Sequence, residues 1–222
     1  MPLYSLYVPK HYGTLSLLPK VIQDFFCVNN GRRFELTISP GYLGEGSEFI
    51  SKVTNILIGH VSSLTVYKGM TSDQRHKNST LALGRSLGVS VSYIFTKNDH
   101  RKMIFFRYEN NTEAVLVGSS NVSTATYFKS SKGEADLFLF YSEEFKNACC
   151  NNISSLQDNG GNAQRENVND QTNRRENDTP QENTDGYRYC VLSESITMNY
   201  EPHTYLNDIY AEFTNSGLHD NA

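Results

Sequence analysis

The sequence predicts an α/β protein in which helices pack on a largely parallel sheet. Segments with strand-type and helix-type hydrophobic patterns alternate along the first half of the chain, which is typical of this class. The chain has 222 residues, of which 38% are hydrophobic, enough for one sizeable core and at most two small domains. The net charge of −4 gives no general attraction to nucleic acid or anionic membranes, so a polyanionic ligand would need a local basic surface.

The first predicted unit is a helix, a strand and a second helix. Apolar residues recur at helical spacing over residues 15–28 and stop at the turn around Gly31. Residues 34–39 alternate as a strand that ends at Pro40, and Ser47 is the expected N-cap of the next helix. The glycine-rich loop between them lacks the spacing of a nucleotide-binding loop, so we interpret it as a tight connection or as a wall of an active-site cleft.

The same alternation continues along the chain, with two consecutive strands in the middle. We expect strands over residues 64–67, 89–95, 100–108, 113–117 and 137–141, and helices over 78–87, 123–128 and from Ser142 onward.

The composition changes at residue 151 and divides the chain into three parts. Residues 1–150 form the main domain, and residues 151–186 are so rich in Asn, Gln, Asp and Glu that we interpret them as a disordered linker or a mobile insertion. Residues 187–222 regain apolar and aromatic side chains but are too few for a separate core. We expect them to pack on the main domain or at an oligomer interface.

Neither a secretory signal nor a membrane-spanning segment is evident, so we expect a soluble, cytoplasmic protein. The four cysteines have no metal-ligand spacing and are expected to be reduced thiols, with two disulfides as the alternative.

Two neighbouring segments carry side chains suited to phosphodiester chemistry. Strand alternation places His100 and Lys102 on the same side of one strand. Ser119 and Asn121 follow the next strand where it gives way to a helix, a position at which backbone N–H groups can bind an anion. Histidine can act as nucleophile or acid near neutral pH, while the other three side chains can bind the non-bridging oxygens. One histidine cannot take both roles in one step, so a second is needed.

The pattern His100-x-Lys102 followed by Gly118-Ser119-x-Asn121 resembles the H-x-K…G-S-x-N signature of the phospholipase D superfamily. The resemblance covers residues 15–150 and implies an α/β sandwich with a mixed sheet. Arg107 stands where the full motif has an aspartate, and the motif occurs once rather than twice. Both features are similar to the single-motif endonuclease branch, which includes small bacterial nucleases and metal-independent restriction endonucleases.

This resemblance implies a homodimeric DNA endonuclease of the restriction type, with no metal and no cofactor. His100 of one chain would form a phosphohistidine, and His100 of the other chain would act as general acid. In that branch a glutamate beyond the asparagine orients the histidine. Glu134 is the nearest match here, and Asp136 is the alternative.

Other interpretations stay open. The same chemistry could act on a phospholipid or another phosphodiester, or the chain could be an inactive binding module with this fold. Taken singly, His100 and Lys102 fit a solvated strand entry, the Ser119–Asn121 segment fits an ordinary helix N-cap, and Glu134 fits a surface carboxylate. The cations that could bind DNA, or could simply aid solubility, are Arg32, Arg33, Arg75, His76, Lys77, Lys129 and Lys132.

Overall fold

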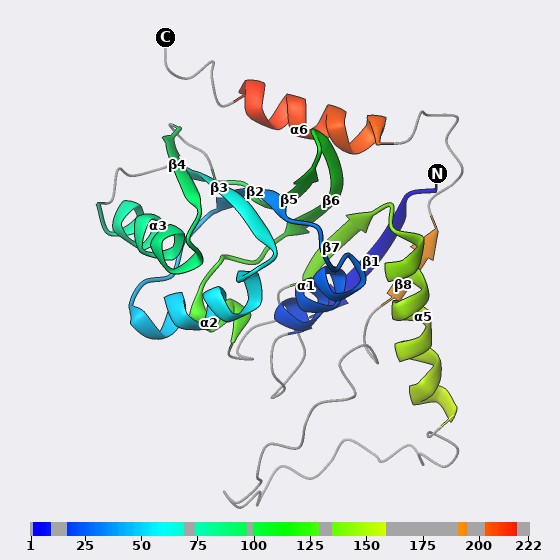
Figure 1. Cartoon of the computed structure of the whole chain (residues 1–222). Coiled ribbons are helices and arrows are strands. Elements are labelled where there is room, and N and C mark those ends of the chain that lie inside the picture. Colours follow the sequence, from blue (N-terminus) through cyan, green and yellow to red (C-terminus); the bar gives the residue numbers. More distant parts are fainter. Residues whose placement is uncertain are drawn as a thin grey trace, which may run out of the picture.

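One eight-stranded mixed sheet runs through the molecule, with strand order β4-β3-β2-β5-β6-β7-β1-β8 (Figure 1). The structure is a computed structural model that describes residues 2–9, 17–68, 74–96, 100–128, 135–158, 191–194 and 203–216. The strands are β1 (Tyr4–Pro9), β2 (Phe34–Pro40), β3 (Val61–Lys68), β4 (Ser90–Phe95), β5 (Lys102–Tyr108), β6 (Asn111–Gly118), β7 (Ala135–Phe140) and β8 (Val191–Glu194). The helices are α1 (Leu17–Val28), α2 (Ser47–Leu57), α3 (Gln74–Leu87), α4 (Thr124–Tyr127), α5 (Glu143–Asp158) and α6 (Thr204–Ser216).

The fold is α/β, as predicted, and its sheet is mixed. The expectation that this sheet is largely parallel is wrong. Among the described strands, only the pairs β2–β3 and β3–β4 are parallel, and the other five pairs are antiparallel. One antiparallel pair has a local cause: between β5 and β6, Tyr108 pairs with Asn111 across a two-residue turn. Glu109 and Asn110 both have positive φ angles, of 49° and 68°, which suits a tight hairpin turn and leaves no room for a crossover helix.

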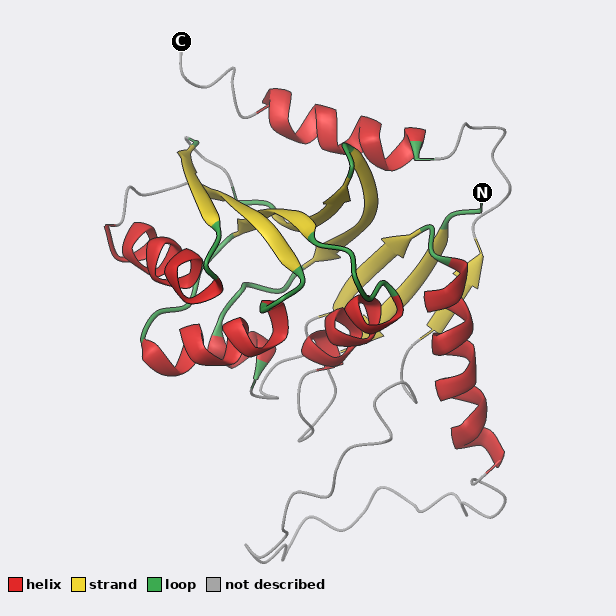
Figure 2. Ribbon diagram, viewed as in Figure 1, coloured by secondary structure: helices red, strands yellow, loops and turns green. Residues whose placement is uncertain are grey.

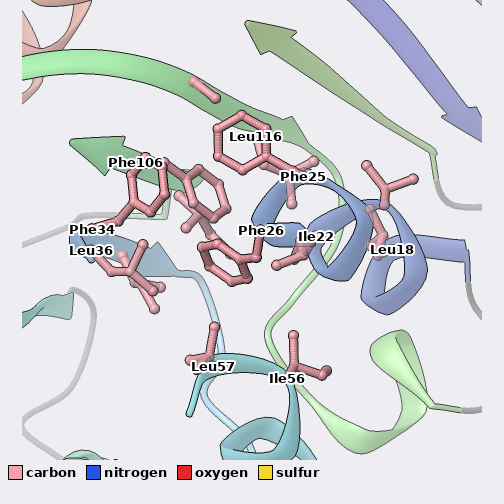
Figure 3. Packing of buried hydrophobic residues seen from close by; sticks show 14 of the residues in the cluster. Leu18, Ile22, Phe25, Phe26, Phe34, Leu36, Ile56, Leu57, Phe106 and Leu116 are labelled. Atoms are coloured by element: carbon pink, nitrogen blue, oxygen red, sulfur yellow. The ribbon is translucent and has the colours of Figure 1, made fainter. Parts of the chain in front are cut away.

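The main core lies between the sheet and helices α1 to α5 (Figures 1 and 2). At its centre the ring of Phe25 from α1 lies 5.4 Å from that of Phe34 and 5.5 Å from that of Phe106. The rings of Phe138 on β7 and Phe145 on α5 lie 5.3 and 5.5 Å away. Figure 3 shows Phe25 and its neighbours on α1 pointing into the side chains of β2 and β5. Burial of each such ring stabilises the fold by about 1.5–3 kcal/mol.

A second, smaller core lies on the opposite face of the sheet, beneath α6. Its buried members are Tyr67, Phe105, Val115, Tyr141, Leu206 and Phe213. Figures 1 and 2 show α6 crossing this face alone, while the other helices lie on the far side. The last part of the chain therefore contributes both this helix and the edge strand β8, which pairs with β1.

The predicted boundary at residue 150 falls inside α5. The hydroxyl of Ser142 accepts a hydrogen bond of 3.1 Å from the N–H of Phe145 and so caps this helix, as expected. The helix then continues to Asp158, since no glycine or proline interrupts the sequence before Gly160. Residues 159–190, which include most of the predicted linker, lie outside the described residues.

Two further local differences have simple causes. Gly46, with a φ of 87°, takes the N-cap position of α2, and Ser47 is the first helical residue instead of the cap. The strand β1 was not expected, although its side chains alternate: Tyr4, Leu6 and Val8 are buried. Within the described part of the chain, every helix is too short or too polar to cross a lipid bilayer.

Candidate active site

The candidate residues meet at one edge of the sheet. Lys102 at the start of β5 lies opposite Pro40 at the end of β2. Because β5 and β6 form a hairpin, the end of β6 returns to the same edge, where Met103 pairs with Val117. The segments 100–102 and 118–121 are therefore neighbours in the structure, as the two-strand prediction requires.

His100 and Lys102 project from the strand entry as a pair. The Nζ atom of Lys102 lies 3.3 Å from Nδ1 of His100 and 3.4 Å from the carbonyl oxygen of His100. His100 is exposed and Lys102 is half-buried. An ammonium group can only donate, so in this arrangement Nδ1 accepts and the proton of a neutral ring sits on Nε2.

Asn121 joins this pair over the loop that follows β2. Its Oδ1 atom accepts a hydrogen bond of 3.1 Å from the backbone N–H of Tyr42. A Cβ atom on Gly41 would lie 2.7 Å from this oxygen and 3.0 Å from Cε of Lys102. Gly41 also has a φ of +62°, a conformation that favours glycine. The side chains of Lys102 and Asn121 thus converge over a position where only a hydrogen fits.

The loop after β2 is held against the loop after β6 by backbone hydrogen bonds. The N–H of Gly44 donates to the carbonyl of Val122 at 2.7 Å, and the N–H of Val122 donates to the carbonyl of Pro40 at 3.4 Å. These bonds make a short parallel bridge between Leu43 and Val122. The glycine-rich loop therefore lies beside the candidate residues, and its predicted role as a wall of an active-site cleft stays a prediction.

Ser119 is bonded to the start of β7. Its hydroxyl donates to the carbonyl of Ala135 at 3.3 Å and accepts from the N–H of the same residue at 3.2 Å. Ser119 is exposed, so its hydroxyl stands at the surface beside Asn121. This geometry makes Ser119 both a brace between β6 and β7 and a candidate ligand for an anion.

Ser120 and Asp136 hold the turn from beneath. Asp136 is buried and accepts a hydrogen bond of 3.2 Å from the N–H of Ser120, and a second from its hydroxyl. A Cβ on Gly118 would lie 2.2 Å from Oδ1 of Asp136, so glycine is required there. Burial, and then the charge of Asp136, raise the pKa of the Tyr127 phenol. Sequence reasoning overlooked Ser120, which occupies the unspecified position of the motif.

The orienting carboxylate stays a prediction. Glu134 lies outside the described residues. Asp136, the alternative, lies in the described part and is engaged by Ser120 as the anchor of the turn. This arrangement assigns Asp136 a structural role in shaping the loop.

Among the cations proposed as a DNA-binding surface, those that the structure describes do not all lie together. Arg32 lies over the ring of Tyr108, 5.2 Å from its centroid, and Arg33 donates to the carbonyl of Val61 at 2.8 Å. Both arginines precede β2, at the sheet edge opposite the candidate site. Arg75 instead lies 4.0 Å from Glu45 of the loop after β2. His76 is buried, and its ring centroid lies 5.0 Å from that of Tyr42. Lys129 and Lys132 lie outside the described residues.

An open groove lies elsewhere, between α2 and α3. Small polar side chains line it, among them Ser47, Ser51, Asn78 and Ser79. None of the described candidate residues borders this groove. The described residues also contain no group of three or more His, Cys, Asp or Glu side chains placed to hold a metal ion.

Comparisons with known proteins add little to this geometry. No protein-family model matches the chain, and no curated protein matches it. Among solved structures, a crystal structure of polyphosphate kinase from Porphyromonas gingivalis is similar at a TM-score of 0.41 and 13% sequence identity. The alignment covers 73% of this chain but only 26% of the kinase chain. A likeness this distant carries no argument about function.

Proposed function

We propose that this chain is a metal-independent phosphodiesterase that acts on DNA as an endonuclease, in the single-motif branch of the phospholipase D superfamily. The observation that supports this best is the convergence of His100, Lys102 and Asn121 at one sheet edge, with Lys102 and Asn121 both against Gly41. Such a cluster offers a nucleophile, a cation and an amide donor to one phosphate group.

The reaction has two steps. Nε2 of His100 attacks the phosphorus, so that an N–P bond forms and a P–O bond breaks, while the partner's His100 donates a proton to the leaving oxygen. Water then attacks the phosphohistidine, loses a proton to the partner's His100, and releases the 5′ or 3′ phosphate. Lys102, Asn121 and Ser119 neutralise or bind the non-bridging oxygens.

The attack requires a lone pair on Nε2, so the ring must carry its proton on Nδ1 during that step. Lys102 now lies against Nδ1 and would have to turn toward the phosphate, which frees Nδ1–H to donate to an acceptor such as Glu134. Substrate binding thus exchanges the lysine contact for a carboxylate contact.

The proposed reaction uses two histidines, and we propose that a second chain supplies the second one. His76 is buried against Tyr42, His60 stacks on Phe26 at 4.8 Å, and His203 lies 5.0 Å from the ring of Tyr141. Each of these three rings packs on an aromatic side chain. A homodimer that places two sheet edges face to face would supply both catalytic histidines.

Plasmid cleavage in excess EDTA tests the proposal. We expect wild-type protein to nick or linearise DNA, His100→Ala to lose roughly 10³-fold or more in rate, and Lys102→Ala to lose about 10²-fold. Lys52→Ala is the matched control, because Lys52 forms an ion pair with Glu48 on α2. This variant should cleave DNA as the wild type does. His100→Ala should still bind the plasmid in a gel-shift assay, since phosphate contacts dominate affinity.

Failure to cleave DNA at any salt or divalent-ion concentration would contradict the nuclease. Hydrolysis of a phospholipid but not of DNA would keep the chemistry and change the substrate. Binding of DNA without turnover of either substrate would point to an inactive binding module.

A further inference from the structure

The residue between His100 and Lys102 is tied to the last helix of the chain. Arg101 points to the opposite side of the strand entry, where its guanidinium carbon lies 3.9 Å from the ring centroid of Phe213 on α6. Its Nη1 atom donates to the carbonyl of Phe213 at 3.0 Å and to the hydroxyl of Ser216 at 2.7 Å. Arg101 therefore binds the C-terminal turn of α6, where helix carbonyls lack intrahelical partners and the helix dipole favours a cation.

This turn of α6 is itself fixed on the sheet. Phe213 is buried, and its ring lies 5.0 Å from that of Tyr67 on β3 and 4.9 Å from that of Phe105 on β5. The backbone of Arg101 is held as well, because its carbonyl accepts a hydrogen bond of 2.9 Å from the buried hydroxyl of Ser39 on β2. Side chain and main chain of Arg101 are thus anchored to two different elements.

We infer that Arg101 is a positioning residue, through which α6 fixes the backbone from which His100 and Lys102 project. This inference rests on the proposed role of those two residues. His100 is exposed and precedes the first hydrogen-bonded residue of β5, so the sheet alone leaves its direction weakly determined. The contacts of Arg101 supply that constraint from the opposite face of the sheet.

The chain offers a matched control at the other end of the same strand. Arg107 also stacks on an aromatic ring of α6, with its guanidinium carbon 4.2 Å from the centroid of Tyr210, and it lies 3.6 Å from Glu35. It stands beside the β5–β6 turn, at the sheet edge away from His100. Loss of either arginine removes one cation–π contact to α6, but only Arg101 adjoins the candidate site.

Four full-length variants test the inference: Arg101→Ala, Arg101→Lys, Phe213→Leu and Arg107→Ala. In cleavage of a fluorescent DNA oligonucleotide we expect Arg101→Ala to lower kcat about tenfold or more with little change in KM. Phe213→Leu should act in the same direction from the helix side. Arg101→Lys should recover only part of the rate, because lysine keeps the charge but lacks the planar fork. Arg107→Ala should stay within about twofold of the wild type.

A second measurement follows the environment of the His100 ring by NMR and does not depend on activity. In protein labelled with ¹³C-histidine, the ring signal of His100, assigned by its loss in His100→Gln, should shift or broaden in Arg101→Ala and Phe213→Leu. The same signal should be unchanged in Arg107→Ala. Thermal unfolding of each variant shows whether its fold is intact.

Equal effects of Arg101→Ala and Arg107→Ala on kcat and on the His100 signal would overturn the inference, since both would then act only through the docking of α6. An unchanged His100 signal in Arg101→Ala would overturn it as well. If wild-type protein cleaves no DNA while the His100 signal responds to Arg101 alone, the positioning role stands and the nuclease proposal fails.

Discussion

At the scale of single residues, the candidate site depends on Gly41. Its α-carbon leaves the space into which Lys102 and Asn121 project, and the N–H of the next residue, Tyr42, donates a hydrogen bond to Asn121 in the loop after β6. The site is therefore shaped by a missing side chain as much as by the polar groups around it.

Replacing Gly41 by alanine should lower both the cleavage rate and the free energy of unfolding. The added methyl group would displace Asn121 or Lys102, and a misplacement of this size can cost roughly 10²-fold in rate. The positive φ should add about 1–3 kcal/mol of strain. Steady-state cleavage rates and urea unfolding measure the two effects.

Gly46→Ala is the control for this prediction. Gly46 lies in the same loop with a φ of +87°, yet a Cβ there would meet nothing within 4 Å. Gly46→Ala should lose at least as much stability, because a φ of 87° with a ψ of 161° is a conformation essentially limited to glycine, and it should keep its activity. Equal loss of activity in both variants would mean that loop strain, and not contact with Lys102 and Asn121, governs the rate.

A pH-dependent prediction concerns the hydrogen bond between β1 and α5. Tyr4 donates to Glu143, and Lys146 lies 3.0 Å from the other carboxylate oxygen; the first contact and then the second lower the pKa of Glu143. The stability that this carboxylate contributes is present above its ordinary pKa and is lost as the pH falls through its lowered pKa. Tyr4→Phe should therefore destabilise the protein more at pH 7 than at pH 3, as measured by urea unfolding. An equal loss at both pH values would contradict the coupling.

The β5–β6 turn also permits a stabilising change. Both central residues have positive φ angles, and Asn-Gly is the preferred pair for such a turn. The double substitution Glu109→Asn and Asn110→Gly should raise the free energy of unfolding by about 0.5–1 kcal/mol, because both residues then adopt the required angles with less strain. A higher Tm with unchanged cleavage activity is the expected result, and a lower Tm would show that the Glu109 side chain matters more than the turn.

At the scale of helices and strands, the sequence predicts much of the local structure. Periodicity located α1, β2, α2, β3, α3, β4 and the β5–β6 pair, because each buries one face against the sheet. Strand direction was not predictable in the same way. The contact of Lys102 with the loop after β2 depends on the antiparallel register of Pro40 with Lys102, which no local pattern specifies. The docking of α6 likewise joins Arg101 to Phe213, which are 112 residues apart in the sequence.

For the whole molecule, the proposed shared site makes a quantitative prediction. If both histidines of a dimer are needed, mixing and re-equilibrating equal amounts of wild-type and His100→Ala chains should leave about a quarter of the wild-type activity per dimer, because mixed dimers are inactive. Activity that falls only in proportion to the wild-type fraction would contradict a shared site. Light scattering of the purified protein gives the oligomeric state directly.

The place of β1 in the sheet has a consequence for synthesis on the ribosome. Both partners of this strand, β7 and β8, follow it far along the chain. The β5–β6 hairpin, by contrast, joins strands that are adjacent in sequence and can close early. We expect the hairpin with its candidate residues to form while the chain is still growing. The strand β1 cannot pair until β7 has been made, and until then its apolar side chains stay exposed to chaperones.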